Sequence, residues 1–178
     1  MKRFAYIFSI LLFSNLAAEI YQNQKVGIDN SGNGILIFSD SKADKIRSFS
    51  YKGVNDEWVD LGIISDPKVE SVYPYLALNE ISGFAVAVWI TFDKDHQTNV
   101  LYGKIYNPIT GWSSIIHQIS DNNVSVIENS IQVSLNESRS KALITWNQKD
   151  KSNNNDIKIG AISVGLALGH WGDATIIS

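Results

Sequence analysis

The sequence predicts an all-β fold built from three similar units of four antiparallel strands. One observation is an internal repeat: "NEISGFAVAVW" at Asn79–Trp89 returns as "NESRSKALITW" at Asn136–Trp146, and "DNSGNGILIF" at Asp29–Phe38 is a third version. A second observation is that short apolar stretches alternate with turn residues, while no segment after the N-terminal region shows a 3.6-residue period. Repeats of this length indicate that the fold is assembled from copies of one structural unit, and that each copy of the motif belongs to one unit.

Two aromatic positions recur at nearly constant spacing and align the three units. The first set is separated by 51 and 57 residues, the second by 54 and 59. The units also close on similar letters, "IIS", "QIS" and "IIS", and a glycine recurs between the two aromatic positions of the second and third units. The sets are Phe38, Trp89 and Trp146; Trp58, Trp112 and Trp171; and the glycines Gly103 and Gly160.

The middle unit shows the four strands most clearly. Ser71–Asn79 is followed by a turn and by Phe84–Thr91, which is apolar almost throughout and is therefore expected to be covered on both faces. A polar loop leads to Val100–Tyr106, and the turn "NPITG" leads to Trp112–Ser120. The first unit predicts strands at 25–28, 34–39, 45–51 and 57–65, and the third at 131–135, 141–146, 156–164 and 170–178.

The N-terminal residues 1–18 have the layout of a secretory signal peptide. Lys2 and Arg3 precede an apolar run that ends at Ala17 and Ala18 and is too short for a membrane span. We therefore expect an exported protein with one domain over residues 19–178, in units of about 24–66, 67–121 and 122–178. Removal of the signal lowers the formal net charge from −3 to −5, because Lys2 and Arg3 are its two charged residues.

Charge and composition exclude several classes of partner. A mildly acidic chain lacks the basic face that nucleic acids require, and no second apolar run predicts a membrane span. The sequence contains no cysteine, so disulfides, thiolate metal sites and thiol nucleophiles are excluded. No cofactor and no metal are expected.

The repeated four-stranded pattern resembles tandem blades of secreted bacterial β-propellers. The resemblance covers all of residues 19–178, and it implies a propeller-like fold without implying an activity. The sequence lacks the "GH…WD" signature of WD40 repeats and the Asp-box order of sialidases. A β-sandwich or a solenoid of the same twelve strands is the competing fold.

Three blades are fewer than the four to eight of closed propellers, so two sheet faces are expected to lack a neighbour. Three explanations remain open. A second copy of the chain completes a ring, the chain is the front part of a once longer propeller, or it stands as an open stack with protected ends. Of these, we favour self-association, because exposed sheet edges and faces promote it.

Aspartates open the loops on one rim of the expected fold. Their carboxylates could bind a cation or a basic partner, or they could serve as turn residues that bond their own backbone. The loop "DKDHQTN" adds a histidine and a second acid, and Phe92 at its edge is the best exposed candidate for stacking on a sugar. The candidate binding residues are Asp40, Asp66, Phe92, Asp93, Asp95, His96, Asp121 and Asp150.

Other side chains are weaker candidates. Tyr73, Tyr75, Tyr102 and Tyr106 could also stack on sugars, and the first two are expected to be core residues. His117 and His170 are interpreted as structural or surface histidines. No nucleophile elbow or phosphate loop is present, so no catalytic residue is predicted.

The sequence therefore predicts an exported, non-enzymatic binding or interaction scaffold for a protein or glycan ligand of unknown identity. The alternatives are a glycan-binding or glycan-cleaving propeller that needs further blades, and a remnant without a present function.

Overall fold

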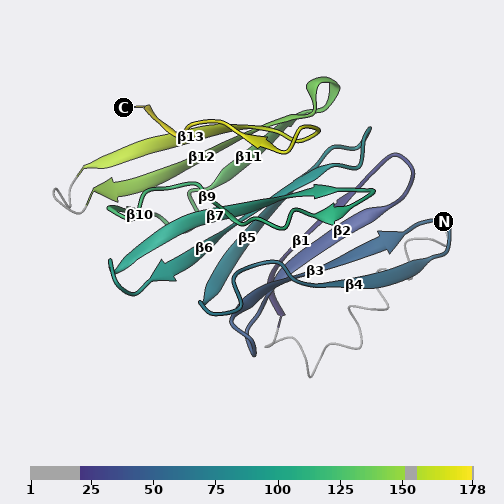
Figure 1. The fold of residues 1–178 in the computed structure, drawn as a ribbon, viewed down its shortest axis with the longest axis horizontal. Helices are drawn as coiled ribbons and strands as arrows, with labels where there is room; N and C mark the ends of the chain where they lie inside the picture. Colours follow the sequence, from purple (N-terminus) through teal and green to yellow (C-terminus); the bar gives the residue numbers. More distant parts are fainter. Residues whose placement is uncertain (1–20, 151–155, 178) are drawn as a thin grey trace.

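The protein is an all-β structure in which three antiparallel sheets follow one another in chain order (Figure 1). This computed structural model describes residues 21–150 and 156–177, and the predicted signal peptide at 1–18 lies outside them. The predicted fold class is confirmed: each sheet contains four strand positions in the order of the sequence, as in a propeller blade. In the described part of the chain, the only helical segment is the short 3₁₀ turn Glu137–Arg139.

The first sheet has the strand order β1-β2-β3-β4 with antiparallel pairing throughout. β1 carries a register shift between Gln22 and Lys25, and β4 is shifted where Gly62 takes a positive φ of 78°. The strands are β1 (Tyr21–Ile28), β2 (Gly34–Asp40), β3 (Lys45–Lys52) and β4 (Glu57–Ile63).

In the second and third sheets, some strand positions are divided into two segments. The predicted continuous strand over 112–120 is wrong in this respect, because β8 pairs with the C-terminal end of β7 and β9 with its middle, and residues 113–116 lie between the two segments. The third sheet divides its first position into β10 and β11 and its fourth into β14 and β15.

The bounds of these strands are as follows. The second sheet contains β5 (Ser71–Leu78), β6 (Ala85–Asp93), β7 (Thr98–Asn107), β8 (Gly111–Trp112) and β9 (His117–Gln118). The third contains β10 (Val124–Val126), β11 (Gln132–Asn136), β12 (Lys141–Asp150), β13 (Ile157–Gly165), β14 (His170–Trp171) and β15 (Thr175–Ile177).

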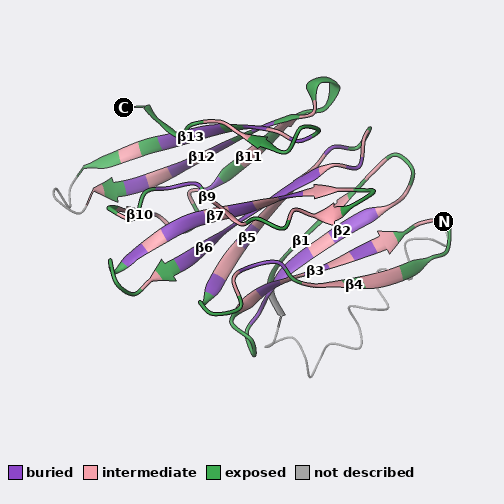
Figure 2. Cartoon of the chain, viewed as in Figure 1, coloured by how far each residue is buried: buried purple, intermediate pink, exposed green. Residues whose placement is uncertain are grey.

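The strand β6 lies between the other two sheets and is buried on both faces (Figure 2). Alternate side chains of a strand point to opposite faces. Val86, Val88 and Ile90 belong to the apolar cluster shared with the third sheet, whereas Ala87 and Trp89 belong to the cluster shared with the first. The prediction that this segment is covered on both faces is confirmed.

The aromatic repeat positions contribute to packing between sheets. Trp89 and Trp146 are each 1% exposed, and each indole lies in the cluster that its sheet shares with the preceding one. The Nε1 of Trp112 donates to Ser48 Oγ at 3.0 Å, which joins the second sheet to the first. The repeated aromatic residues are therefore explained by packing, because large side chains are needed to fill the space between adjacent sheets.

The first residues of the repeated motif form the turn between the first two strand positions of each sheet. Its first residue accepts hydrogen bonds from backbone N–H groups of the turn: Asp29 from Ser31 and Asn33, Asn79 from Ile81 and Ser82, and Asn136 from Arg139. Such side chain-to-backbone bonds stabilise tight turns.

These turns are also joined to one another from sheet to sheet. The N–H of Asn30 donates to the carbonyl of Glu80 at 2.7 Å, and the buried Asn79 Nδ2 donates to the carbonyl of Glu137 at 2.8 Å. The motif therefore occurs three times because each copy forms a turn, and adjacent turns are hydrogen-bonded to each other.

The topology defines two edges of the stack. The hairpin edge holds the turns β1–β2, β3–β4 and their equivalents in the other sheets. The connection edge holds the turns β2–β3 and β6–β7 and the segments 64–70 and 119–123 that join the sheets. Within the described residues, no helix is long and apolar enough to cross a membrane.

Replacement of Gly160 by Ala should destabilise the fold, because an added Cβ would lie 2.2 Å from Trp146 Cε2. Crowding of this kind costs about 1–3 kcal/mol. Gly165→Ala, on the same strand, is the control: its nearest neighbour would be the His170 carbonyl oxygen at 3.7 Å, an ordinary contact. Urea unfolding of both variants measures the difference, and equal stabilities would contradict the described packing of Trp146.

Candidate functional site

Four of the aspartates predicted as binding residues fold the loops of the connection edge. Asp40, Asp66, Asp93 and Asp121 each accept a backbone N–H from the residue two positions later, at 2.8–3.1 Å. The carboxylates are thus engaged in turn formation, which is the alternative that the sequence left open for them. Their role in binding stays a prediction.

The loop containing Asp93, Asp95 and His96 is organised around the first of these residues. Asp93 accepts the N–H groups of Asp95 and His96, and its Oδ2 lies 2.8 Å from Nδ1 of the His96 ring. The backbone hydrogen bond from His96, followed by the bond from its ring, holds the pKa of Asp93 below its usual value. This side chain is an anion at neutral pH.

The structure brings some of the predicted residues together and separates others. Asp66 and Asp93 both lie near Tyr102, whose pKa is raised first by burial and then by these two charges. Asp40 lies 3.9 Å from Arg47, and Asp150 pairs with Lys158 at 3.6 Å within the third sheet. Phe92 is 37% exposed beside the Asp93 loop. No group of three metal-ligating side chains occurs among the described residues.

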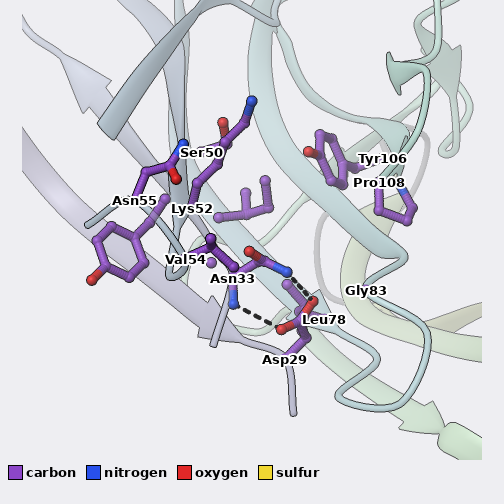
Figure 3. Close-up of a pocket in the computed structure, with 13 residues that line it drawn as sticks. Asp29, Asn33, Ser50, Lys52, Val54, Asn55, Leu78, Gly83, Tyr106 and Pro108 are labelled. Atoms are coloured by element: carbon purple, nitrogen blue, oxygen red, sulfur yellow. Dashed lines mark hydrogen bonds between the residues drawn. The ribbon is translucent and has the colours of Figure 1, made fainter. Parts of the chain in front are cut away.

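A groove lies on the opposite side, at the hairpin edge, between the first and second sheets (Figure 3). It has a volume of about 280 Å³, close to the lower end of the roughly 300–1,000 Å³ typical of small-molecule sites. Its floor and walls include Ile35, Leu78 and Pro108. The polar residues that line it are Asp29, Asn33, Ser50, Lys52 and Asn55.

Tyr106 supplies an aromatic ring on the second-sheet side of the groove (Figure 3). The ring packs against that of Trp112 at a centroid distance of 5.3 Å, which holds its orientation. Burial and, to a smaller extent, the charge of Asp29 raise the pKa of Tyr106, so its hydroxyl stays protonated and can donate a hydrogen bond.

The first-sheet side of the groove presents fixed polar groups. Asp29 accepts from the N–H of Asn33 at 2.8 Å and from its Nδ2 at 3.3 Å, and Asn33 Oδ1 accepts from the N–H of Gly53. Figure 3 shows Asn33 and Lys52 across the groove from Tyr106. The groove therefore places an aromatic ring opposite amide, carboxylate and ammonium groups.

A second hollow of about 460 Å³ lies at the same edge between the second and third sheets. Its aromatic element is a stack of His117 on Trp171, with ring centroids 4.7 Å apart and planes 14° from parallel. Burial lowers the pKa of His117, so the imidazole is neutral at pH 7. The interpretation of His117 as a structural histidine agrees with this packing.

The sequence placed the candidate site at the connection edge and, among the groove residues, identified only Tyr106. Asp29 belongs to the repeated turn motif. The motif predicts a turn, but it does not predict that Tyr106 of the second sheet lies on the other side of a groove. Asn33 and Asn55 stand in polar turns and Lys52 is the last residue of β3, and no sequence motif marks any of the three.

Comparison with solved structures supports the architecture. The chain matches an endo-arabinase from Bacteroides thetaiotaomicron with a TM-score of 0.51 at 11% identity, over 87% of this chain and 61% of that one. It also matches the polysaccharide lyase Uly1 with a TM-score of 0.55 at 8% identity, over 87% of this chain and 40% of that one. At such identities the likeness shows the fold alone.

Two further findings define the extent of the likeness. The chain spans about 60% and 40% of the lengths of these two proteins. No protein-family model matches the sequence, and no curated protein matches it.

The comparisons correct one prediction. The sequence predicts a non-enzymatic protein, and this is wrong: the endo-arabinase and the polysaccharide lyase are, by name, enzymes of carbohydrate chemistry. The absence of a recognisable catalytic motif was the basis of the prediction. Residues that act on glycans converge only in space, so their absence from the linear pattern excludes nothing.

The neutral state of His117 makes stability depend on pH. The unfolded chain takes up a proton at about pH 6.5, and the folded state resists this uptake because partial burial lowers the pKa of the His117 ring. Stability is therefore expected to fall as the pH drops below about 6.5. His117→Phe, which keeps an aromatic ring on Trp171, should show a smaller loss between about pH 7 and pH 5.

Chemical denaturation across this pH range measures the effect. The exposed His170→Phe variant retains His117 and should behave like the unmodified chain. Identical pH profiles for the His117→Phe variant and the unmodified chain would show that the ring is accessible to protons in the folded state.

Proposed function

We propose that the chain is a β-propeller-type protein that binds or cleaves a glycan, with the groove between the first and second sheets holding a sugar residue. The observation that carries the proposal is the groove itself, in which the ring of Tyr106 faces the polar side of Asp29, Asn33 and Lys52. The two structural neighbours, an endo-arabinase and a polysaccharide lyase, support the choice of ligand class.

The chemistry of a sugar fits this arrangement. A pyranose or furanose ring has an apolar C–H face that packs on an aromatic ring, and a rim of hydroxyls that both donate and accept hydrogen bonds. Asn33 and Asn55 offer amide donors and acceptors, and the Lys52 ammonium donates to hydroxyls or to the carboxylate of an acidic sugar. A small number of polar groups around an apolar surface is the usual composition of such sites.

Binding is the part of the function that the groove supports most directly. Hydrolysis of a glycosidic bond ordinarily uses two carboxyl groups about 5–9.5 Å apart. Among the residues lining the groove, Asp29 is the only carboxylate, and it is engaged in the β1–β2 turn. Cleavage would therefore need an acid from outside the groove, such as one on a further sheet. Export, expected from the N-terminal residues, would bring the protein to extracellular glycans.

Removal of the Tyr106 ring tests the location of the site. The unmodified chain should bind at least one member of a panel of neutral and acidic oligosaccharides in calorimetric titration. Tyr106→Ala should weaken that binding by about tenfold or more, equivalent to roughly 1.4 kcal/mol.

Tyr102→Ala is the matched control, because Tyr102 packs in the same apolar cluster between the first and second sheets but lies near Asp66 and Asp93 at the other edge. A larger loss in Tyr102→Ala than in Tyr106→Ala would move the site to the connection edge. Failure of the folded protein to bind any oligosaccharide, together with no release of new reducing ends, would contradict the proposed function.

A further inference from the structure

The outer face of the first sheet is an apolar surface against which no other described sheet packs. Register places Val26, Leu36 and Phe49 in one row across the strands, and Ile28 in line with Tyr51 and Trp58 in the next. Val26 is 63% exposed and Ile28 is 47% exposed. Ile63, which stands in line with Arg47 and Phe38 on the same face, is 46% exposed. We call this surface the first outer face.

The outer face of the third sheet is a second apolar surface, at the opposite end of the stack. Leu143 is 50% exposed, and Ile157, Ile159 and Ile177 are 58%, 44% and 56% exposed. Ile159 pairs with Ile177, and Leu143 stands between two buried cluster residues of β12 but belongs to neither apolar cluster. We call this surface the third outer face.

The repeat shows what each outer face corresponds to within the stack. On β6 and β12, Trp89 and Trp146 point toward the preceding sheet, and Phe38 holds the same position on β2. Phe38 shares the face of Leu36, so the first outer face is the one that would receive a preceding sheet.

The third outer face holds the complementary position. Leu143 stands three residues before Trp146, as Val86 stands before Trp89, and Val86 packs against the third sheet. The residues of the second sheet that pack against the third sheet thus have counterparts on the third sheet, and the counterpart of Val86, Leu143, is exposed there. Inside the chain, a face like the third outer face packs against a face like the first outer face at two places: between the first and second sheets and between the second and third.

From this correspondence we infer that the third outer face of one copy packs on the first outer face of a second copy, and that two copies close into a ring of six sheets. The occupant of each face is thus a second copy of this chain, in the same arrangement as the internal contacts between sheets. Six sheets fall within the four to eight of closed propellers. A head-to-tail contact of this kind is stable as a finite assembly when the rotation closes.

The inference does not depend on the proposed function. It is independent of whether a glycan binds, because it rests on exposed apolar side chains and on the repeat. It does bear on that function, because a ring would add the further sheets from which an acid outside the groove would have to come.

The mass of the full chain in solution tests the inference. Light scattering after size separation, at concentrations up to on the order of 100 µM, should give twice the mass of one chain. Val26→Asp and Ile159→Asp each place a charge within one of the paired faces, and each should raise the dissociation constant by at least about tenfold. Both positions are exposed in the single chain, so circular dichroism should show unchanged folding.

Ile109→Asp is the matched control, because Ile109 is 91% exposed in the β7–β8 turn and lies on neither outer face. It should leave the dimer intact. A mixture of Val26→Asp and Ile159→Asp should form heterodimers, since one pair of unaltered faces remains between them.

Three results would overturn the inference. A folded monomer at the highest concentration would show that the faces do not pair. Dissociation by only one of the two variants would indicate that like faces pair with each other. Open polymers in place of dimers would show that the rotation between copies does not close.

Discussion

The constraint on which the structure depends is the burial of β6 on both of its faces. A strand whose seven residues from Ala85 to Thr91 are all buried needs a packed surface above and below, and a single sheet cannot supply this. The second sheet therefore requires both neighbours, and the order of the three sheets follows from that requirement. The side chains of Trp89 and Trp146 fill the two interfaces from equivalent positions, which is why the repeat keeps its spacing around them.

The turns at the hairpin edge connect this packing to the candidate site. The first residue of each repeated motif folds its own turn, and adjacent turns are bonded through Asn30 and Asn79. These bonds fix the first sheet's polar turn beside the second sheet, where Tyr106 closes the groove. The groove is thus a consequence of how the sheets are joined at one edge, and it does not require any irregular loop.

The sequence predicted the architecture well because the architecture depends on local patterns. Alignment on the repeated aromatic residues located four strand positions in each sheet, although β10 was not predicted. Two of the closing serines act alike: Ser65 Oγ and Ser120 Oγ accept the N–H of Ile46 and Leu101. The match of Gly103 with Gly160 was misleading. Gly103 pairs with Val88, whereas Gly160 pairs with Trp146, so the two glycines lie on opposite faces.

The site could not be found in the same way, because its parts come from different sheets. The aspartates that the sequence analysis selected form hydrogen bonds within turns. The groove, in contrast, is lined by Asp29, Lys52 and Tyr106, which come from turns and strands far apart in the chain. The breaks in the fourth strands were also missed. Residues 113–116 have strand-like composition, yet only the segments on either side of them, β8 and β9, form ladder pairs with β7.

Hydrogen–deuterium exchange followed by mass spectrometry tests the central claim most directly. If β6 is enclosed by two sheets, the amides of residues 85–91 should exchange more slowly than those of any other segment, while β1, paired with β2 alone, should exchange much faster. Exchange of β6 at the rate of β1 would contradict the account, because it would mean that the second sheet is not held between the other two.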